Sequence, residues 1–133
     1  MKLAEAVRNA RRVYLIGNGG SYANAVHVAN DLLSVGVRAY TLDPASLTAS
    51  ANDFGYETVF SRWISVVGEK GDLLVALSGS GNSENILEAI KTAQGIGMKT
   101  WMVTRYLQGV DMQESEEEQI KVGHAVMKEL REG

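Results

Sequence analysis

Two glycine- and serine-rich loops, residues 18–21 and 78–83, could bind a ligand. Each follows an apolar run and precedes a helical pattern, in "VYLIGNGGSYANAVHVANDLL" and in "LLVALSGSGNSENILEAI". Glycines let a ligand approach the backbone, and free N–H groups with the helix dipole make a strand-to-helix loop an anion site. We therefore predict binding of a phosphorylated substrate there, by Asn18, Gly19, Gly20, Ser21, Ser78, Ser80, Asn82 and Ser83. Ser78, Ser80 and Ser83 are the better phosphate ligands, and the first loop lines the rest of the substrate. The alternative is a pair of tight turns, with Asn82 or Ser83 capping the second helix.

The loops do not match the nucleotide-binding motifs. Tyr22 occupies the third glycine position of a dinucleotide fingerprint, and no acidic residue ends the second strand to take a ribose hydroxyl. The second loop lacks the Gly-Lys-Ser/Thr of a P-loop. We expect no nucleotide cofactor, and a small phosphorylated sugar as the ligand.

Four side chains could carry acid–base or metal chemistry. His27 and Asp31 are four residues apart and share one face of a helix. Glu116 and His124 are eight apart and lie roughly on one face after two turns. If the two helices meet, the four groups could act as acids and bases or form an N/O metal site. The alternative is that the histidines are ordinary surface or packed residues and that "ESEEE" is a solvated first turn.

The elements that must position these residues alternate between strand and helix. We predict strands at 13–17, 37–42, 72–77 and 99–104, from their apolar, β-rich composition. Helices are expected at the N-terminus, from Ser21 as a cap to Gly36, after Asp43-Pro44, near 57–67, at 82–97 and at about 112–131, with a turn at 52–55. Such alternation predicts a parallel sheet covered by helices on both faces, in one domain spanning residues 1–133.

Composition narrows the classes of function. The chain has 133 residues, a net charge of −3 and no cysteine. The charge argues against nucleic-acid binding, and the lack of cysteine excludes disulfides and thiolate metal sites. With no signal-peptide pattern and no apolar stretch long enough to span a membrane, we expect a cytoplasmic protein with no membrane partner.

The segments "GNGGSYANAVHVANDL", "ANDFGYETVFSRWI", "GDLLVALSGSGNSENILEAIKTAQGIGMKT" and "EQIKVGHAVMKEL" resemble the SIS (sugar isomerase) domain family. Within that family they are most similar to the phosphoheptose isomerases, and the resemblance covers nearly the whole chain. It implies a flavodoxin-like α/β/α sandwich and a homo-oligomer, a tetramer or dimer, with active sites between subunits. It also implies interconversion of sedoheptulose 7-phosphate and a heptose 7-phosphate.

The resemblance also implies roles for single residues. Ser21, Ser78, Ser80 and Ser83 match serines of the family's two loops, and Asp53 matches an aspartate of its substrate pocket. Asp31 and His124 match the catalytic carboxylate and histidine, although Asp31 is one methylene shorter than the family's glutamate. His27, Asp31, Glu116 and His124 match positions that could bind Zn²⁺, Glu116 standing in place of a glutamine.

The family has a further strand after the one ending at "KTWMVT", where this chain has "RYLQGVDMQESEE". We therefore expect a sheet that is short of one edge strand. The short chain and Asp31 leave open a second function, a non-catalytic SIS module that binds a phosphosugar or a protein such as a replication initiator. A generic nucleotide-binding domain is the third and weakest alternative.

Overall fold

The computed structural model describes residues 2–104 and 112–132 and has a parallel four-stranded sheet. The strands are β1 (Val13–Gly17), β2 (Ala39–Thr41), β3 (Leu73–Leu77) and β4 (Lys99–Val103). Their order is β2-β1-β3-β4, and all three neighbouring pairs are parallel. This is the flavodoxin order, and the described residues end it at the fourth strand, as expected of a sheet short of one edge strand.

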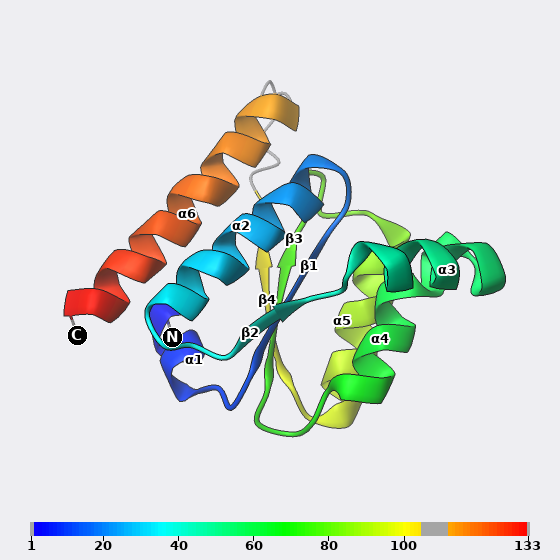
Figure 1. The fold of residues 1–133 in the computed structure, drawn as a ribbon, viewed down its shortest axis with the longest axis horizontal. Coiled ribbons are helices and arrows are strands. Elements are labelled where there is room, and N and C mark those ends of the chain that lie inside the picture. Colours follow the sequence, from blue (N-terminus) through cyan, green and yellow to red (C-terminus); the bar gives the residue numbers. More distant parts are fainter. Residues whose placement is uncertain (1, 105–111, 133) are drawn as a thin grey trace.

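Helices cover both faces of the sheet, so the predicted three-layer α/β/α architecture is confirmed (Figure 1). On one face lie α1 (Leu3–Asn9), α2 (Gly20–Ser34) and α6 (Met112–Glu132). On the other lie α4 (Val59–Val67) and α5 (Glu84–Ile96), joined by α3 (Pro44–Phe54) and a 3₁₀ turn, Tyr56–Thr58. The strands supply both cores, because alternate side chains point to opposite faces.

The first core, under α1, α2 and α6, contains Val13, Leu15, Leu73, Val75 and Leu77 of the strands. The second core, under α4 and α5, contains Tyr14, Ile16, Leu74 and Ala76. β1 and β3 are therefore buried on both faces, which explains why their sequences show no polar alternation.

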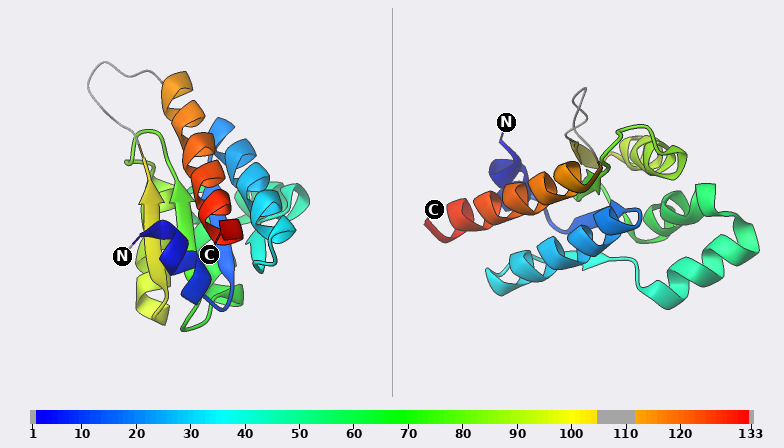
Figure 2. Two further views of the ribbon diagram at one scale, coloured as in Figure 1. Left: turned by 90° about the vertical axis from the view of Figure 1, so that its left-hand side faces the viewer. Right: turned by 90° about the horizontal axis from the view of Figure 1, so that it is seen from above.

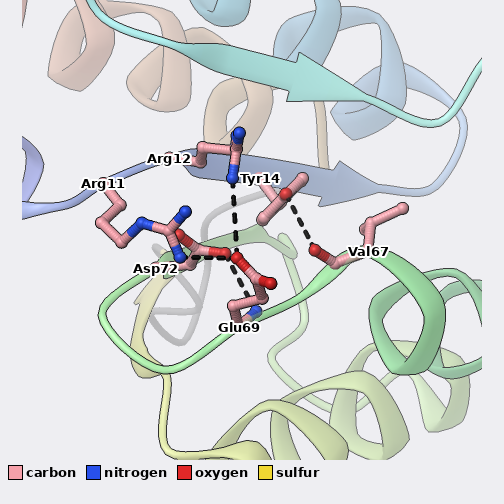
Figure 3. Close-up of polar contacts among 6 residues, drawn as sticks. All are labelled: Arg11, Arg12, Tyr14, Val67, Glu69 and Asp72. Atoms are coloured by element: carbon pink, nitrogen blue, oxygen red, sulfur yellow. Dashed lines mark hydrogen bonds and ion pairs between the residues drawn. The ribbon is translucent and has the colours of Figure 1, made fainter.

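A cluster of polar residues, drawn in Figure 3, links the segments that precede β1 and β3. It lies at the edge of the sheet opposite the two glycine- and serine-rich loops. Arg11 Nη1 donates to Glu69 Oε2 at 2.5 Å, and the Glu69 backbone N–H donates to Asp72 Oδ2 at 2.9 Å. The Arg11 hydrogen bond and charge lower the pKa of Glu69 below its usual value. Asp72 is 1% exposed, so this corner is fixed by a buried carboxylate as well as by surface charges.

Two local predictions were wrong. The turn expected at 52–55 is instead the last turn of α3, which ends at Phe54 and is followed by Gly55 with φ of 100°. The predicted cap of α2, Ser21, lies inside the first turn, because the helix begins at Gly20. The segment 105–111, part of the "RYLQGVDMQESEE" stretch, lies outside the described residues.

In the part of the chain that the structure describes, no helix is long and apolar enough to cross a membrane.

Candidate active site

The two glycine- and serine-rich loops meet at the carboxyl edge of the sheet. β1 and β3 are neighbours, and Gly17 at the end of one pairs with Leu77 at the end of the other. The loops that follow therefore lie side by side at the switch point of the strand order, where open α/β sheets bind ligands. Together they form a pocket of about 230 Å³, lined by Asn18, Gly19, Gly20, Ser21, Leu77, Ser78, Gly79, Ser80, Ser83 and Glu116.

The second loop presents hydroxyl donors to this pocket. Ser78 Oγ accepts a hydrogen bond from the Gly81 N–H and Ser80 Oγ accepts one from the Asn82 N–H, each at 3.1 Å. A hydroxyl that accepts a backbone hydrogen bond keeps its own proton for another acceptor. Ser83 is the N-cap residue of α5, and its side chain makes no capping hydrogen bond. Three hydroxyls and the dipole of α5 are thus available to an anion.

The first loop is shaped by glycine and held by α6. Gly19 has φ of 55° and ψ of −122°, a conformation that side chains rarely allow. Ser21 is 4% exposed, and its Oγ accepts a hydrogen bond from Gln119 Nε2 at 3.0 Å. Because this bond again leaves the hydroxyl proton free, Ser21 is a donor on the wall of the pocket rather than a helix cap.

Glu116 is held at the amino terminus of α2. The Glu116 carboxylate lies directly against Gly20, in the space that a Cβ at this position would occupy. Asn24 Nδ2 donates to the Glu116 backbone carbonyl at 2.7 Å and to Gln119 Oε1 at 3.0 Å. These bonds hold this turn of α6 against α2, and Glu116 lies in the pocket wall, where the helix dipole favours a negative charge.

Tyr22, the residue after Ser21, links two elements through its hydroxyl group and has a raised pKa. Tyr22 OH donates to the Leu42 carbonyl at 2.5 Å, and burial, followed by the charge of Asp43, raises the Tyr22 pKa. Tyr22 therefore stays a neutral donor that ties the start of α2 to the end of β2.

Further along the same two helices, His27, Asp31 and His124 form a compact group. His27 Nε2 lies 3.3 Å from Asp31 Oδ2, His124 Nε2 lies 3.6 Å from the same oxygen, and the two Nε2 atoms are 3.3 Å apart. The histidine side chains are about half exposed, at 51% and 52%, so neither is a core residue. Asp31 Oδ2 is buried and accepts no hydrogen bond from the described residues.

Close packing of α2 against α6 makes this group possible. The two helices run side by side in both views (Figure 2), and Gly123 lies against Val28 at their contact. A Cβ at Gly123 would come within 2.6 Å of Val28 Cγ2. The missing side chain lets His124, the next residue, reach His27 across the interface.

The donor atoms of this group have the separations of a tetrahedral metal site. In a tetrahedral zinc site with bonds of about 2.0–2.1 Å, donor atoms lie roughly 3.3–3.4 Å apart. The three donor separations here are 3.3, 3.3 and 3.6 Å, and the unpartnered Asp31 oxygen is one of the donors. Glu116 is not part of the described group, because its carboxylate lies beside Gly20 instead. The four-residue set expected from the sequence is thus reduced to three.

Two predicted ligand residues lie away from the pocket. Asp53 is exposed in the last turn of α3, where it accepts a hydrogen bond from Asn52 Nδ2 at 3.2 Å. The side chain of Asn82 is exposed, and neither residue is among those that line the pocket of this single chain.

Sequence reasoning missed three residues that build the site: Gln119, Asn85 and Tyr56. Gln119 is 1% exposed, and its place on the buried stripe with Gly123 and Val126, at positions i, i+4 and i+7, was a signal that it faces the core. Asn85 and Tyr56 contact Asn18, a long-range arrangement for which the sequence carries no periodic signal.

Comparison with known proteins gives consistent matches. The SIS domain family model matches residues 1–105. The phosphoheptose isomerase of Chlorobaculum parvum is 44% identical over 108 residues, which are 74% of this chain and 52% of that protein. That of Sodalis glossinidius is 40% identical over 129 residues, 92% of this chain and 66% of that protein. The chain therefore spans about half to two thirds of the length of these curated relatives.

Solved structures of two phosphoheptose isomerases have a similar fold. Phosphoheptose isomerase from Neisseria gonorrhoeae has a TM-score of 0.89 and 29% identity, with 98% of this chain and 82% of that chain covered. A phosphoheptose isomerase from Francisella tularensis has a TM-score of 0.87 and 26% identity, with 98% and 83% covered.

Proposed function

This chain belongs to the SIS domain family, and from that premise we propose that it isomerises a seven-carbon sugar phosphate. The reaction interconverts sedoheptulose 7-phosphate and a heptose 7-phosphate. The observation that carries the proposal is the presence, in one chain, of an anion pocket between the two loops and a His–Asp–His group on the α2–α6 pair. The names and sequence identities of the curated relatives support the same reaction.

The hydroxyls of Ser78, Ser80 and Ser83, at the amino terminus of α5, bind the phosphate group. Glu116 lies across the pocket at the start of α2, and its carboxylate would repel a second anion there. The phosphate is therefore bound at the second loop, and the hydroxyls of the sugar face Ser21 and Glu116. A carboxylate suits that side, because it accepts hydrogen bonds from hydroxyl groups.

The histidine group lies along α2 from the first loop. Six residues separate Ser21 from His27 on α2, which is about 9 Å along the helix axis. With bonds of about 1.5 Å, an extended seven-carbon sugar phosphate is on the order of 10 Å long. With the phosphate at the second loop, the sugar chain that faces Ser21 can thus extend along α2 toward the histidines.

Asp31 and His124 supply the acid–base chemistry. Isomerisation through an enediol removes a proton from one carbon, returns a proton to its neighbour and moves a proton between the two oxygens. The Asp31 carboxylate, with an oxygen free of hydrogen bonds in the described residues, is the base toward carbon. The ring nitrogen of His124 lies 3.6 Å from that Asp31 oxygen. His124 transfers the proton between the two substrate oxygens.

As an alternative use of the same atoms, His27, Asp31 and His124 would hold a zinc ion. When bound, the ion would supply a Lewis acid that polarises the carbonyl oxygen of the sugar. Turnover measured with added zinc and after chelation separates this role from acid–base chemistry by the side chains alone.

The active protein is a homo-oligomer, a dimer or tetramer, in which Asp53 lines the pocket of a neighbouring copy. No residue of α3 is buried, and Phe54 and Val66 are 55% and 83% exposed beside a groove of about 370 Å³. A second copy covering this face would bury apolar surface and bring Asp53 to another chain. In sedimentation the wild type should be a dimer or tetramer, and Val66→Asp should shift it toward monomer. A monomeric wild type would contradict the proposed oligomer.

A cytoplasmic site of action, with neither a nucleic-acid nor a membrane partner, is part of the same proposal, since sugar phosphates are metabolites of that compartment.

The test is turnover of sedoheptulose 7-phosphate by the purified protein, followed by nuclear magnetic resonance. We expect conversion by the wild type, and its loss in His124→Ala and Asp31→Asn with melting temperatures close to that of the wild type. Asn30→Ala, an exposed change on α2 between the two site residues of that helix, is the control. Thermal stabilisation by the sugar phosphate without conversion would contradict the isomerase and favour a non-catalytic binding module.

A further inference from the structure

The side chain of Asn18, on the wall of the pocket, is held by two residues from other elements. Asn18 Nδ2 donates to Asn85 Oδ1 at 2.8 Å, and Asn85 Nδ2 donates back to Asn18 Oδ1 at 2.9 Å. Tyr56 OH donates to the same Asn18 oxygen at 2.7 Å. Asn85 is 4% exposed and lies in the first turn of α5, directly after the second loop. The amide pair therefore joins the two ligand-binding loops to each other.

Counting donors and acceptors shows what remains for a ligand. An amide oxygen has two lone pairs, and an amide nitrogen has two protons. Asn85 and Tyr56 use both lone pairs of Asn18 Oδ1, and Asn85 accepts one of the two protons. The side chain of Asn18 has one N–H left, so it can donate to a ligand but cannot accept.

We propose that Asn85 and Tyr56 are positioning residues that hold the Asn18 amide as a dedicated donor to the bound sugar phosphate. This inference rests on the proposed function. Without them the amide could rotate and present its oxygen, which would repel phosphate and other acceptor-rich groups. The three residues thus ensure that the pocket wall between the two loops presents a hydrogen-bond donor rather than an acceptor.

Tyr56→Phe is the sharpest variant, because Tyr56 is 47% exposed and its ring can stay in place while only the hydroxyl is lost. We expect affinity for sedoheptulose 7-phosphate, measured by calorimetry, to fall about three- to tenfold, the effect of one hydrogen bond. Tyr40→Phe is the matched control, since Tyr40 is similarly exposed at 41% and lies on β2, outside the pocket lining.

A double-mutant cycle separates positioning from a general structural role. If Tyr56 and Asn85 act through Asn18, then Tyr56→Phe and Asn85→Ala should each weaken binding in the wild type but not in an Asn18→Ala background. Equal losses in both backgrounds, or no loss in the wild type, would overturn the inference. If Asn85→Ala does not fold, the Tyr56 arm of the cycle decides alone.

The failure of this inference is distinguishable from failure of the proposed function. A wild type that binds neither sedoheptulose 7-phosphate nor inorganic phosphate contradicts both. A wild type that binds while Tyr56→Phe and Tyr40→Phe behave alike contradicts the positioning role only.

Discussion

His27 Nε2 and His124 Nε2 face each other at 3.3 Å, although the two residues are 97 positions apart in the chain. The buried oxygen of Asp31 lies within 3.6 Å of both nitrogens. Three donor atoms at these separations have two uses, the binding of a metal ion and the transfer of protons. The proposed activity depends on that group and on the anion pocket between the two loops.

Zinc binding is the first prediction. Wild-type protein should bind one Zn²⁺ per chain in calorimetry, and His27→Ala or His124→Ala should weaken binding by more than about 100-fold. Even outer-shell partners are worth 10- to 100-fold, and these residues would contact the ion directly. Asn30→Ala is again the control, and equal zinc affinity in all variants would contradict the site.

The serine cradle gives the second prediction. Ser78→Ala and Ser80→Ala should each weaken the binding of sedoheptulose 7-phosphate by roughly 10- to 100-fold, because each removes a hydrogen bond to a charged group. Ser65→Ala is the matched control, since Ser65 is exposed on α4 and its hydroxyl donates to the Arg62 carbonyl, outside the pocket lining. Unchanged affinity in both loop variants would show that the phosphate does not bind at the second loop.

Helix packing gives the third prediction. Gly123→Ala should lower the free energy of unfolding by about 1–3 kcal/mol, because the new methyl group would overlap Val28 and push α6 from α2. The same displacement should weaken zinc binding, since His124 follows Gly123. Gly95→Ala in α5, where a Cβ meets nothing within 4 Å, should instead stabilise by roughly 0.5–1 kcal/mol. Chemical denaturation measures both, and similar effects of the two changes would be evidence against the contact.

The fourth prediction concerns acid stability. Arg11 lowers the pKa of Glu69 in the folded protein, so the carboxylate stabilises the fold above the unfolded pKa of about 4.3, and this contribution is lost as pH falls through the folded pKa. Glu69→Gln should therefore lower the melting temperature at pH 7, with the difference shrinking below about pH 4. Glu88→Gln on the exposed face of α5 is the control. A difference that does not vary with pH would argue against the Arg11 contact.

Much of the fold could be predicted because its signals are local. The apolar runs at 13–17 and 73–77 lack polar alternation, and each is followed by glycine and serine, so buried parallel strands with ligand loops at one edge were expected. The helical spacing of His27 and Asp31 also predicted a shared face. That face and its partner on α6 were both found.

The remaining features depend on contacts between distant residues. Ser21 has the composition of a helix cap, but Gln119 bonds its hydroxyl from α6, which no local pattern reveals. Glu116 shares a rough helical face with His124, yet a separation of eight residues is about 12 Å of helix, and its carboxylate lies beside Gly20 instead. Spacing predicts which face a residue occupies, and only the helix–helix contact decides what it meets.

Solvent exchange during turnover is the sharpest test of proton transfer by Asp31. With sedoheptulose 7-phosphate in D₂O, we expect conversion to the heptose phosphate with deuterium at the carbon that gains a proton, because Asp31 exchanges its proton with water. Asp31→Asn should show neither conversion nor exchange. A folded wild-type protein that gives no product, or an Asp31→Asn variant that still converts the substrate, would contradict proton transfer by the Asp31 carboxylate.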